Sequence, residues 1–244
     1  MPSLLTTLRL RVALLALIGL GFTLSAALWL ARVYDLSPAF PWLATVLFTA
    51  AMALVLLVGM PHHPFPEFGA ANLVTMWRLT LVAVVAGFVL ENPSRDRAML
   101  IVGVAMLCVT LDGVDGWLAR RSRLSSTLGA RFDMETDALL ILLLSLLVWR
   151  YGKAGFWVLA SGLMRYAFVG AGWVLPWMAG RLTPTARGKT VAVLQFFGLS
   201  IALMPFVAPP ASGLVAGLTL GALAWSFAVD VWRLWSQRTS DDRR

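Results

Sequence analysis

Four aspartates lie at helical spacing in residues 111–140 of a chain that is otherwise strongly apolar. Asp112 and Asp115 are three residues apart, and Asp133 and Asp137 are four residues apart. Within helices, these spacings place each pair on one face. Carboxylates crowded together must bind protons or cations, and oxygen ligands without nearby His or Cys favour hard ions such as Mg²⁺ or Mn²⁺. The pattern predicts a site for two divalent ions, which suits the transfer of a phosphoryl group.

Small residues accompany both aspartate pairs. Gly116 and Ala119 continue the helical face of the first pair, and Gly129 begins the face of the second. Such a surface lets a bulky ligand approach the backbone beside the charges. The alternative is that the carboxylates only form ion pairs with neighbouring basic residues, namely Arg120, Arg121, Arg123 and Arg131. The repeated spacing with small residues between the carboxylates favours the ligand site.

The elements that must hold these aspartates are membrane helices. Hydrophobic residues make up 59% of the 244 residues and charged residues only 13%, and the mean hydropathy is +0.81. The apolar runs are continuous and do not alternate as barrel strands do. Eight segments approach the ~20 residues that a bilayer requires: 12–31, 40–60, 72–90, 98–120, 130–149, 154–179, 190–207 and 212–231. This predicts an all-α, polytopic membrane helical bundle, with a six-helix core preceded by two extra N-terminal transmembrane helices.

The domain division and the orientation follow from prolines and basic residues. The segment PHHPFPEFGA (61–70) interrupts the helical pattern, so we expect a two-helix hairpin in residues 1–66 and a six-helix catalytic domain in residues 67–244. Arg and Lys are denser on the side of the termini and the aspartates, which the positive-inside rule assigns to the cytoplasm. The net charge of +8 is dispersed among helix ends, which favours contact with anionic lipid and not with nucleic acid.

The aspartate motif resembles the signature of the CDP-alcohol phosphotransferase (CDP-alcohol phosphatidyltransferase) family. The matching pattern is Asp112-x2-Asp115-Gly116-x2-Ala119-Arg120-x8-Gly129-x3-Asp133-x3-Asp137. The resemblance extends to a six-helix core over residues 72–235 and leaves out the first two helices. It implies transfer of a phosphatidyl, or other substituted phosphate, group from a CDP-linked donor such as CDP-diacylglycerol to an alcohol, with release of CMP.

The resemblance also implies roles for individual residues. Two Mg²⁺ or Mn²⁺ ions would be held by Asp112, Asp115, Asp133 and Asp137. Asp137 would also act as general base toward the acceptor hydroxyl. The donor nucleotide would be bound by residues of the same motif and of the preceding helix, namely Asn72, Thr75, Gly116, Ala119, Arg120 and Gly129. Asn72 and Thr75 belong to the segment ANLVTMWR (71–78), which resembles the family's Pro-Asn-x-x-Thr-x-x-Arg motif except that Ala71 replaces the proline; an ordinary helix start is the alternative.

Basic residues in the second half of the chain are candidates for binding the acceptor. Arg165 is a basic residue deep inside a predicted span, where an unpaired charge is costly. It is expected to bind a phosphate or carboxylate, or else to pair with Asp230. Residues 186–195, which include Arg187 and Lys189, resemble elements of phosphatidylglycerophosphate synthases. This points to glycerol 3-phosphate as the acceptor and leaves serine, inositol phosphate and another phospholipid open.

We therefore expect a Mg²⁺-dependent enzyme of phospholipid biosynthesis, multi-pass in the bacterial inner membrane, with its active site facing the cytoplasm. The resemblance further implies a homodimer. A membrane transporter or ion-binding protein is one alternative, but the sequence lacks paired helix breaks in two repeated halves. A non-catalytic scaffold is the other, but all four aspartates are present.

Overall fold

The computed structural model describes residues 2–60, 64–65, 67–122, 126–179 and 185–241, without the side chains of residues 2–5, 114–122, 179 and 238–241. These described residues form eight α-helices with short 3-10 and π segments and contain no strand, which confirms the all-α prediction. Contacts divide the chain into two compact units, Met1–Leu140 and Ile141–Arg244. The division between these units falls inside a helix.

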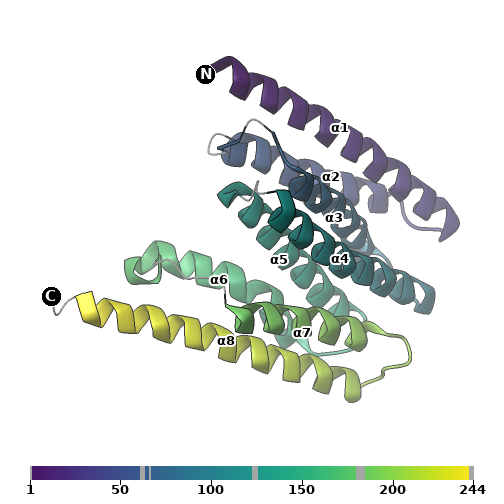
Figure 1. Cartoon of the computed structure of the whole chain (residues 1–244). Coiled ribbons are helices and arrows are strands. Elements are labelled where there is room, and N and C mark those ends of the chain that lie inside the picture. Colours follow the sequence, from purple (N-terminus) through teal and green to yellow (C-terminus); the bar gives the residue numbers. More distant parts are fainter. Residues whose placement is uncertain (1, 61–63, 66, 123–125, 180–184, 242–244) are drawn as a thin grey trace. The chain divides into compact units, whose positions relative to one another are not determined.

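The first unit is arranged around one central helix. α3 (Ala70–Gly87) packs against α1, α2 and α4, and Figure 1 shows these helices side by side. In chain order the unit contains α1 (Pro2–Val33), α2 (Ala39–Leu54), the π-helix η1 (Val55–Gly59), α3, the 3-10 helix η3 (Phe88–Leu90), α4 (Arg95–Ser122) and the first part of α5 (Thr127–Arg150). The two N-terminal helices are thus packed directly on the helix that begins the expected core.

Burial distinguishes α3 from the other apolar helices. Of the most apolar 18-residue window in Ala70–Leu90, 67% is buried, against 22% in Thr6–Val33. Phe40 of α2 lies directly on Gly87, where a β-carbon would come within 2.7 Å of its ring, and the Thr23 hydroxyl donates to that of Thr80 at 3.4 Å. Small and polar residues on α3 therefore allow the N-terminal hairpin to approach closely.

A buried carboxylate ties the hairpin loop to the loop after α3. Glu91 is 5% exposed and accepts hydrogen bonds from the Ser37 amide at 3.0 Å and the Ser37 hydroxyl at 2.6 Å. Arg97 of α4 lies 3.5 Å from the other carboxylate oxygen. Since a buried carboxylate requires such partners, Glu91 holds α1, α2 and α4 in register at this end of the unit.

The second unit contains the end of α5, α6 (Ala160–Val174), α7 (Ala186–Leu203) and α8 (Ala211–Asp241). The predicted single segment 154–179 was wrong, because α6 is flanked by separate 3-10 helices, η4 (Phe156–Leu159) and η5 (Pro176–Ala179). Leu175 has φ −115° and ψ 94°, as expected for a residue before proline, which disfavours the helical region. α7 begins four residues before the predicted segment because the Thr185 side chain caps it by accepting from the Gly188 amide.

Lys153 holds together the ends of helices in the second unit. Its ammonium donates to the carbonyls of Met204 at 2.9 Å and Val207 at 2.7 Å, and its own carbonyl accepts from the Ser212 hydroxyl at 2.6 Å. Burial lowers the pKa of this lysine. The two carbonyls follow the end of α7, so the lysine supplies donors that the helix itself lacks there.

Within the described residues, four helical segments are long and apolar enough to cross a membrane: Thr6–Val33, Ala39–Gly59, Ala70–Leu90 and Ala211–Gln237. This is the property of an integral membrane protein. These four segments are fewer than the eight predicted spans, so the division into six core spans and two extra spans stays a prediction. α4 and α5 have the required length, but the aspartates interrupt their apolar stretches, and α6 has only 15 residues.

Candidate active site and metal centre

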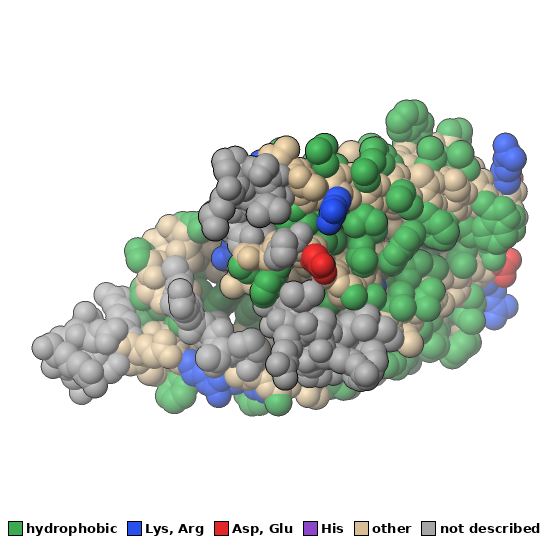
Figure 2. Space-filling model, turned by 45° about the horizontal axis from the view of Figure 1, so that its top comes forward, with side chains coloured by type: hydrophobic (Ala, Val, Ile, Leu, Met, Phe, Trp, Pro, Cys, Tyr) green, Lys and Arg blue, Asp and Glu red, His purple; other side chains and the backbone are tan. Residues whose placement is uncertain are grey.

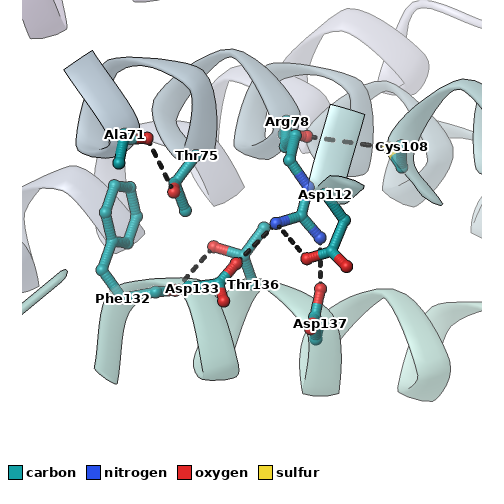
Figure 3. A network of polar contacts seen from close by, with 9 residues as sticks. All are labelled: Ala71, Thr75, Arg78, Cys108, Asp112, Phe132, Asp133, Thr136 and Asp137. Atoms are coloured by element: carbon teal, nitrogen blue, oxygen red, sulfur yellow. Dashed lines mark hydrogen bonds and ion pairs between the residues drawn. The ribbon is translucent and has the colours of Figure 1, made fainter. Parts of the chain in front are cut away.

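Three of the four predicted aspartates meet around a buried arginine. Arg78 of α3 is 1% exposed. Its Nη1 lies 3.0 Å from Asp112 Oδ1 and 2.5 Å from Asp133 Oδ1, and its Nη2 contacts Asp137 Oδ1. Figure 3 shows the guanidinium between α3 and α5, directed at all three carboxylates. Asp112 comes from α4 and the other two from α5, so three helices build this cluster.

The cluster has the donor set of a hard-metal site. One oxygen from each of Asp112, Asp133 and Asp137 lies within 4.8 Å of the other two. Their side chains are 40%, 39% and 26% exposed, so the carboxylates can be reached while the arginine beneath them is covered. Three carboxylates without nitrogen or sulfur ligands fit Mg²⁺ or Mn²⁺. The residues present therefore fit the group that the sequence predicts.

Helical spacing explains why α5 delivers two of these carboxylates together. Ser126 caps α5, its hydroxyl accepting from the Gly129 amide at 3.0 Å. The helix then carries Asp133 and Asp137 one turn apart on one face. Thr136 in the same turn donates to the Phe132 carbonyl at 2.8 Å. The face that carries Asp133 and Asp137 is directed at Arg78 of α3.

Asn72 and Gly129, predicted donor-binding residues from different helices, are in contact. A β-carbon on Gly129 would lie 2.5 Å from Asn72 Oδ1. Asn72 is 5% exposed and donates through its amide nitrogen to the Phe68 carbonyl. Thr75 is 2% exposed, and its hydroxyl donates to the Ala71 carbonyl at 3.1 Å. α3 and α5 therefore approach each other closely one to two turns before Arg78.

Four predicted residues lie on α4 after Asp112 but outside the described side chains: Asp115, Gly116, Ala119 and Arg120. Their position on the helix is described, because α4 continues to Ser122. α4 therefore passes through the whole first half of the aspartate motif, as the spacing argument requires.

The predicted acceptor residues belong to the second unit. Arg165 is half-buried on α6, and Lys189 is exposed in the first turn of α7. Arg187 is engaged: its Nη2 pairs with Asp230 of α8, its Nε donates to Ser226 Oγ at 3.2 Å, and its guanidinium lies 5.8 Å from the Trp225 ring. Asp230, which was suggested as an alternative partner of Arg165, thus pairs with Arg187.

Arg78 is the site residue whose role the sequence did not reveal. It was predicted as part of the motif at 71–78, but the aspartates were expected to bind metal ions, with arginines nearby in sequence as the alternative partners. One signal could have identified it, since a charged residue in the middle of an apolar helix requires a partner or a cavity. Its carbonyl also accepts a weak hydrogen bond from the buried Cys108 Sγ at 3.9 Å, which places α4 against α3 beside the cluster.

Comparison with known proteins identifies the family. The family model for CDP-alcohol phosphatidyltransferase matches residues 68–232, well over half of the chain. The match begins just before α3 and includes all of the aspartate motif. The chain therefore belongs to the CDP-alcohol phosphatidyltransferase family, a family of membrane-embedded transferases. Searches of curated proteins and of solved structures found no match.

Proposed function

We propose that the protein transfers a phosphatidyl group from a CDP-linked lipid such as CDP-diacylglycerol to an alcohol, releasing CMP, in a reaction that requires divalent ions. The observation that carries this proposal is the convergence of Asp112, Asp133 and Asp137 within 4.8 Å, inside the region that matches the family. Such carboxylates suit a reaction in which positioning and charge neutralisation supply most of the catalysis.

Each carboxylate has a proposed task. Asp112, Asp133 and Asp137, with Asp115 one turn further along α4, would hold two Mg²⁺ or Mn²⁺ ions. When bound, these ions would offset the charge of the donor diphosphate and of the departing CMP. Asp137, the least exposed of the three, would accept the proton of the acceptor hydroxyl. Arg78 would have to release carboxylate oxygens for metal binding, because its guanidinium already contacts one oxygen of each aspartate.

The donor nucleotide would lie beside the small residues of α4 and α5. Gly116 and Ala119 would leave room for it, Arg120 would contact its phosphates, Gly129 would permit close packing of the helices there, and Asn72 and Thr75 would line the approach. The close packing of Asn72 on Gly129 supports this arrangement, because a side chain at position 129 would push α3 and α5 apart.

The acceptor is proposed to be glycerol 3-phosphate, as in phosphatidylglycerophosphate synthases. Arg165 and Lys189 would bind its phosphate. Arg187 would contribute to this binding while it remains paired with Asp230. Residues 67–244 would form the catalytic domain and residues 1–66 an added hairpin. The distribution of basic residues supports a cytoplasm-facing site in a bacterial inner membrane. A homodimer is also proposed, and chemical cross-linking in membranes tests it.

The decisive experiment measures CMP release by the purified full-length protein with CDP-diacylglycerol and Mg²⁺, adding acceptors one at a time. We expect release with glycerol 3-phosphate, loss of release in EDTA, and loss in Asp137→Asn. Asp35→Asn is the matched control, because Asp35 lies in the loop between α1 and α2. If no acceptor gives CMP that depends on Asp137, the proposal of a transferase is wrong.

A further inference from the structure

An apolar cavity of about 430 Å³ lies in the first unit, between the N-terminal hairpin and α5. Its volume and its mostly apolar lining are in the range of small-molecule sites. One wall comes from α2 and η1, the other from α5, and Leu79 of α3 also lines it. The first wall lies before residue 68 and so outside the region that matches the family. The cavity is therefore a feature that the hairpin adds to the catalytic core.

The cavity faces away from the aspartate cluster. Glu135 and Leu139, which line it, follow Asp133 and Asp137 by two residues, a rotation of about 200° around a helix. Phe132 and Leu79, which also line it, are 6% and 1% exposed and belong to the apolar core between α3 and α5. None of the three described aspartates of the cluster lines the cavity.

The local backbone explains why the helices separate here. α2 continues as the π-helix η1, a wider helical form that is frequent at functional sites. At the end of η1, Gly59 lies so close to Leu128 that a β-carbon would overlap the leucine side chain. The two walls thus touch at Gly59 and Leu128, and the cavity extends from that contact along α5.

The shape of the cavity fits an acyl chain. Its lining on α5 extends from Thr127 to Leu139, about 18 Å at the helical rise. This exceeds half the ~30 Å thickness of the hydrocarbon layer. Leu54 and Val58, on the opposite wall, are 61% and 59% exposed, so the cavity is open to the bilayer along its side. Figure 2 shows a face on which hydrophobic side chains predominate and charged ones are few.

One basic residue near the N-terminal end of the α5 wall indicates the headgroup. Arg131 lines the cavity one turn after Thr127, where this wall begins, and Glu135 lies one turn further along α5. Arg131 is exposed, forms no hydrogen bond or ion pair with the described part of the chain, and lies near the N-terminus of α5, where the helix dipole also favours an anion. A phosphate would be attracted to Arg131, whereas the charge of Glu135 would repel a headgroup that carries a further negative charge.

We propose that this cavity binds one acyl chain of a zwitterionic bilayer phospholipid, with its phosphate at Arg131. The chemistry selects a phosphoethanolamine lipid of the surrounding membrane. The bound lipid fills the space between the hairpin and α5 and so joins the hairpin to the helix that carries Asp133 and Asp137. This site is separate from that of the transferred lipid.

Native mass spectrometry of the delipidated full-length protein tests the proposal, with equimolar phosphatidylethanolamine, phosphatidylglycerol and diacylglycerol and without CDP-lipid or acceptor. The wild type should retain one phosphatidylethanolamine in preference to both others. Ala51→Phe, which fills the cavity from α2, should reduce this retention at least about tenfold. Leu57→Phe is the matched control, since Leu57 is 76% exposed and does not line the cavity, and it should bind as the wild type does.

Arg131→Gln provides a second measurement that does not alter packing. It should abolish the preference for phosphatidylethanolamine over diacylglycerol, because diacylglycerol lacks the phosphate. Equal retention of diacylglycerol by the wild type, or equal effects of Ala51→Phe and Leu57→Phe, would show ordinary annular lipid and overturn the proposal. A preference for phosphatidylglycerol would overturn the assignment of the headgroup. Should Ala51→Phe fail to fold, the Arg131→Gln comparison decides alone.

Discussion

Replacing Arg78 with glutamine should lower the stability of the metal-free protein and raise its affinity for divalent ions. The guanidinium contacts Asp112, Asp133 and Asp137, whose oxygens lie within 4.8 Å of one another. Without it, the carboxylates repel one another by about 3.5 kcal/mol per pair at an effective dielectric constant of ~20. Their side chains are 26–40% exposed, so solvent reduces this repulsion substantially.

A loss of about 3 kcal/mol in the free energy of unfolding is therefore expected in EDTA, the lower end of the range for breaking a buried ion pair. For a chain of this size, this lowers the melting temperature by about 6–12 °C. A divalent ion supplies the missing positive charge. Because it no longer has to displace a guanidinium, its apparent dissociation constant should fall at least about tenfold, which corresponds to 1.4 kcal/mol.

The single cysteine of the chain offers a direct assay. Cys108 is buried beside the Arg78 carbonyl, so a thiol-reactive dye reports its exposure on heating. Melting is measured in EDTA and over a Mg²⁺ or Mn²⁺ titration. Arg97→Gln is the control, because it loses an ion pair with Glu91 that lies outside the cluster, and its metal-induced shift should equal that of the wild type. A metal-induced shift in Arg78→Gln no larger than in the wild type would refute the view that arginine and metal are alternative counter-charges.

Three further substitutions test packing and hydrogen bonds elsewhere. Gly129→Ala places a methyl group 2.5 Å from Asn72 Oδ1; it should destabilise by about 1–3 kcal/mol and raise the KM for the CDP-lipid donor, and adding Asn72→Ala should restore part of the stability. Glu91→Ala leaves the Ser37 amide and hydroxyl without their acceptor and should cost about 1–3 kcal/mol in thermal unfolding, whereas a mutant as stable as the wild type would show that this contact is dispensable. Lys153→Met removes two hydrogen bonds to carbonyls beyond α7 and should cost a similar amount without changing metal affinity.

Local spacing was sufficient to predict the aspartate cluster but not its counter-charge. Asp133 and Asp137 had to share a face once α5 was a helix, and Asp112 could face them because few residues separate α4 from α5 in the chain. Arg78 lies 34 residues before Asp112 in the chain, and its pairing with three carboxylates depends on how α3 packs between α4 and the hairpin. Helical periodicity carries no information about such packing.

Helix boundaries show the same limit. The apolar run at 154–179 is continuous in composition, so the hydropathy pattern predicts one span. The α-helix nevertheless ends before Leu175, which precedes Pro176. A single proline therefore has more effect on the helix boundary than the average hydropathy of the segment. The earlier starts of α5 at Thr127 and α7 at Ala186 have a related cause: Ser126 and Thr185 cap polar first turns that a search for apolar residues excludes.

The N-terminal hairpin gains a function from the position of α3. Arg78 can remain an effective partner for the carboxylates only if the helix that carries it is shielded from lipid and water, because the strength of the interaction depends on a low local dielectric. α1 and α2 supply that shield: they pack on α3, Phe40 closes over Gly87, and Thr23 meets Thr80. The family match begins only at residue 68, so this shield lies outside the region that matches the family. In this chain, the hairpin therefore supports the site by burying the central helix from which Arg78 and Asn72 reach α5.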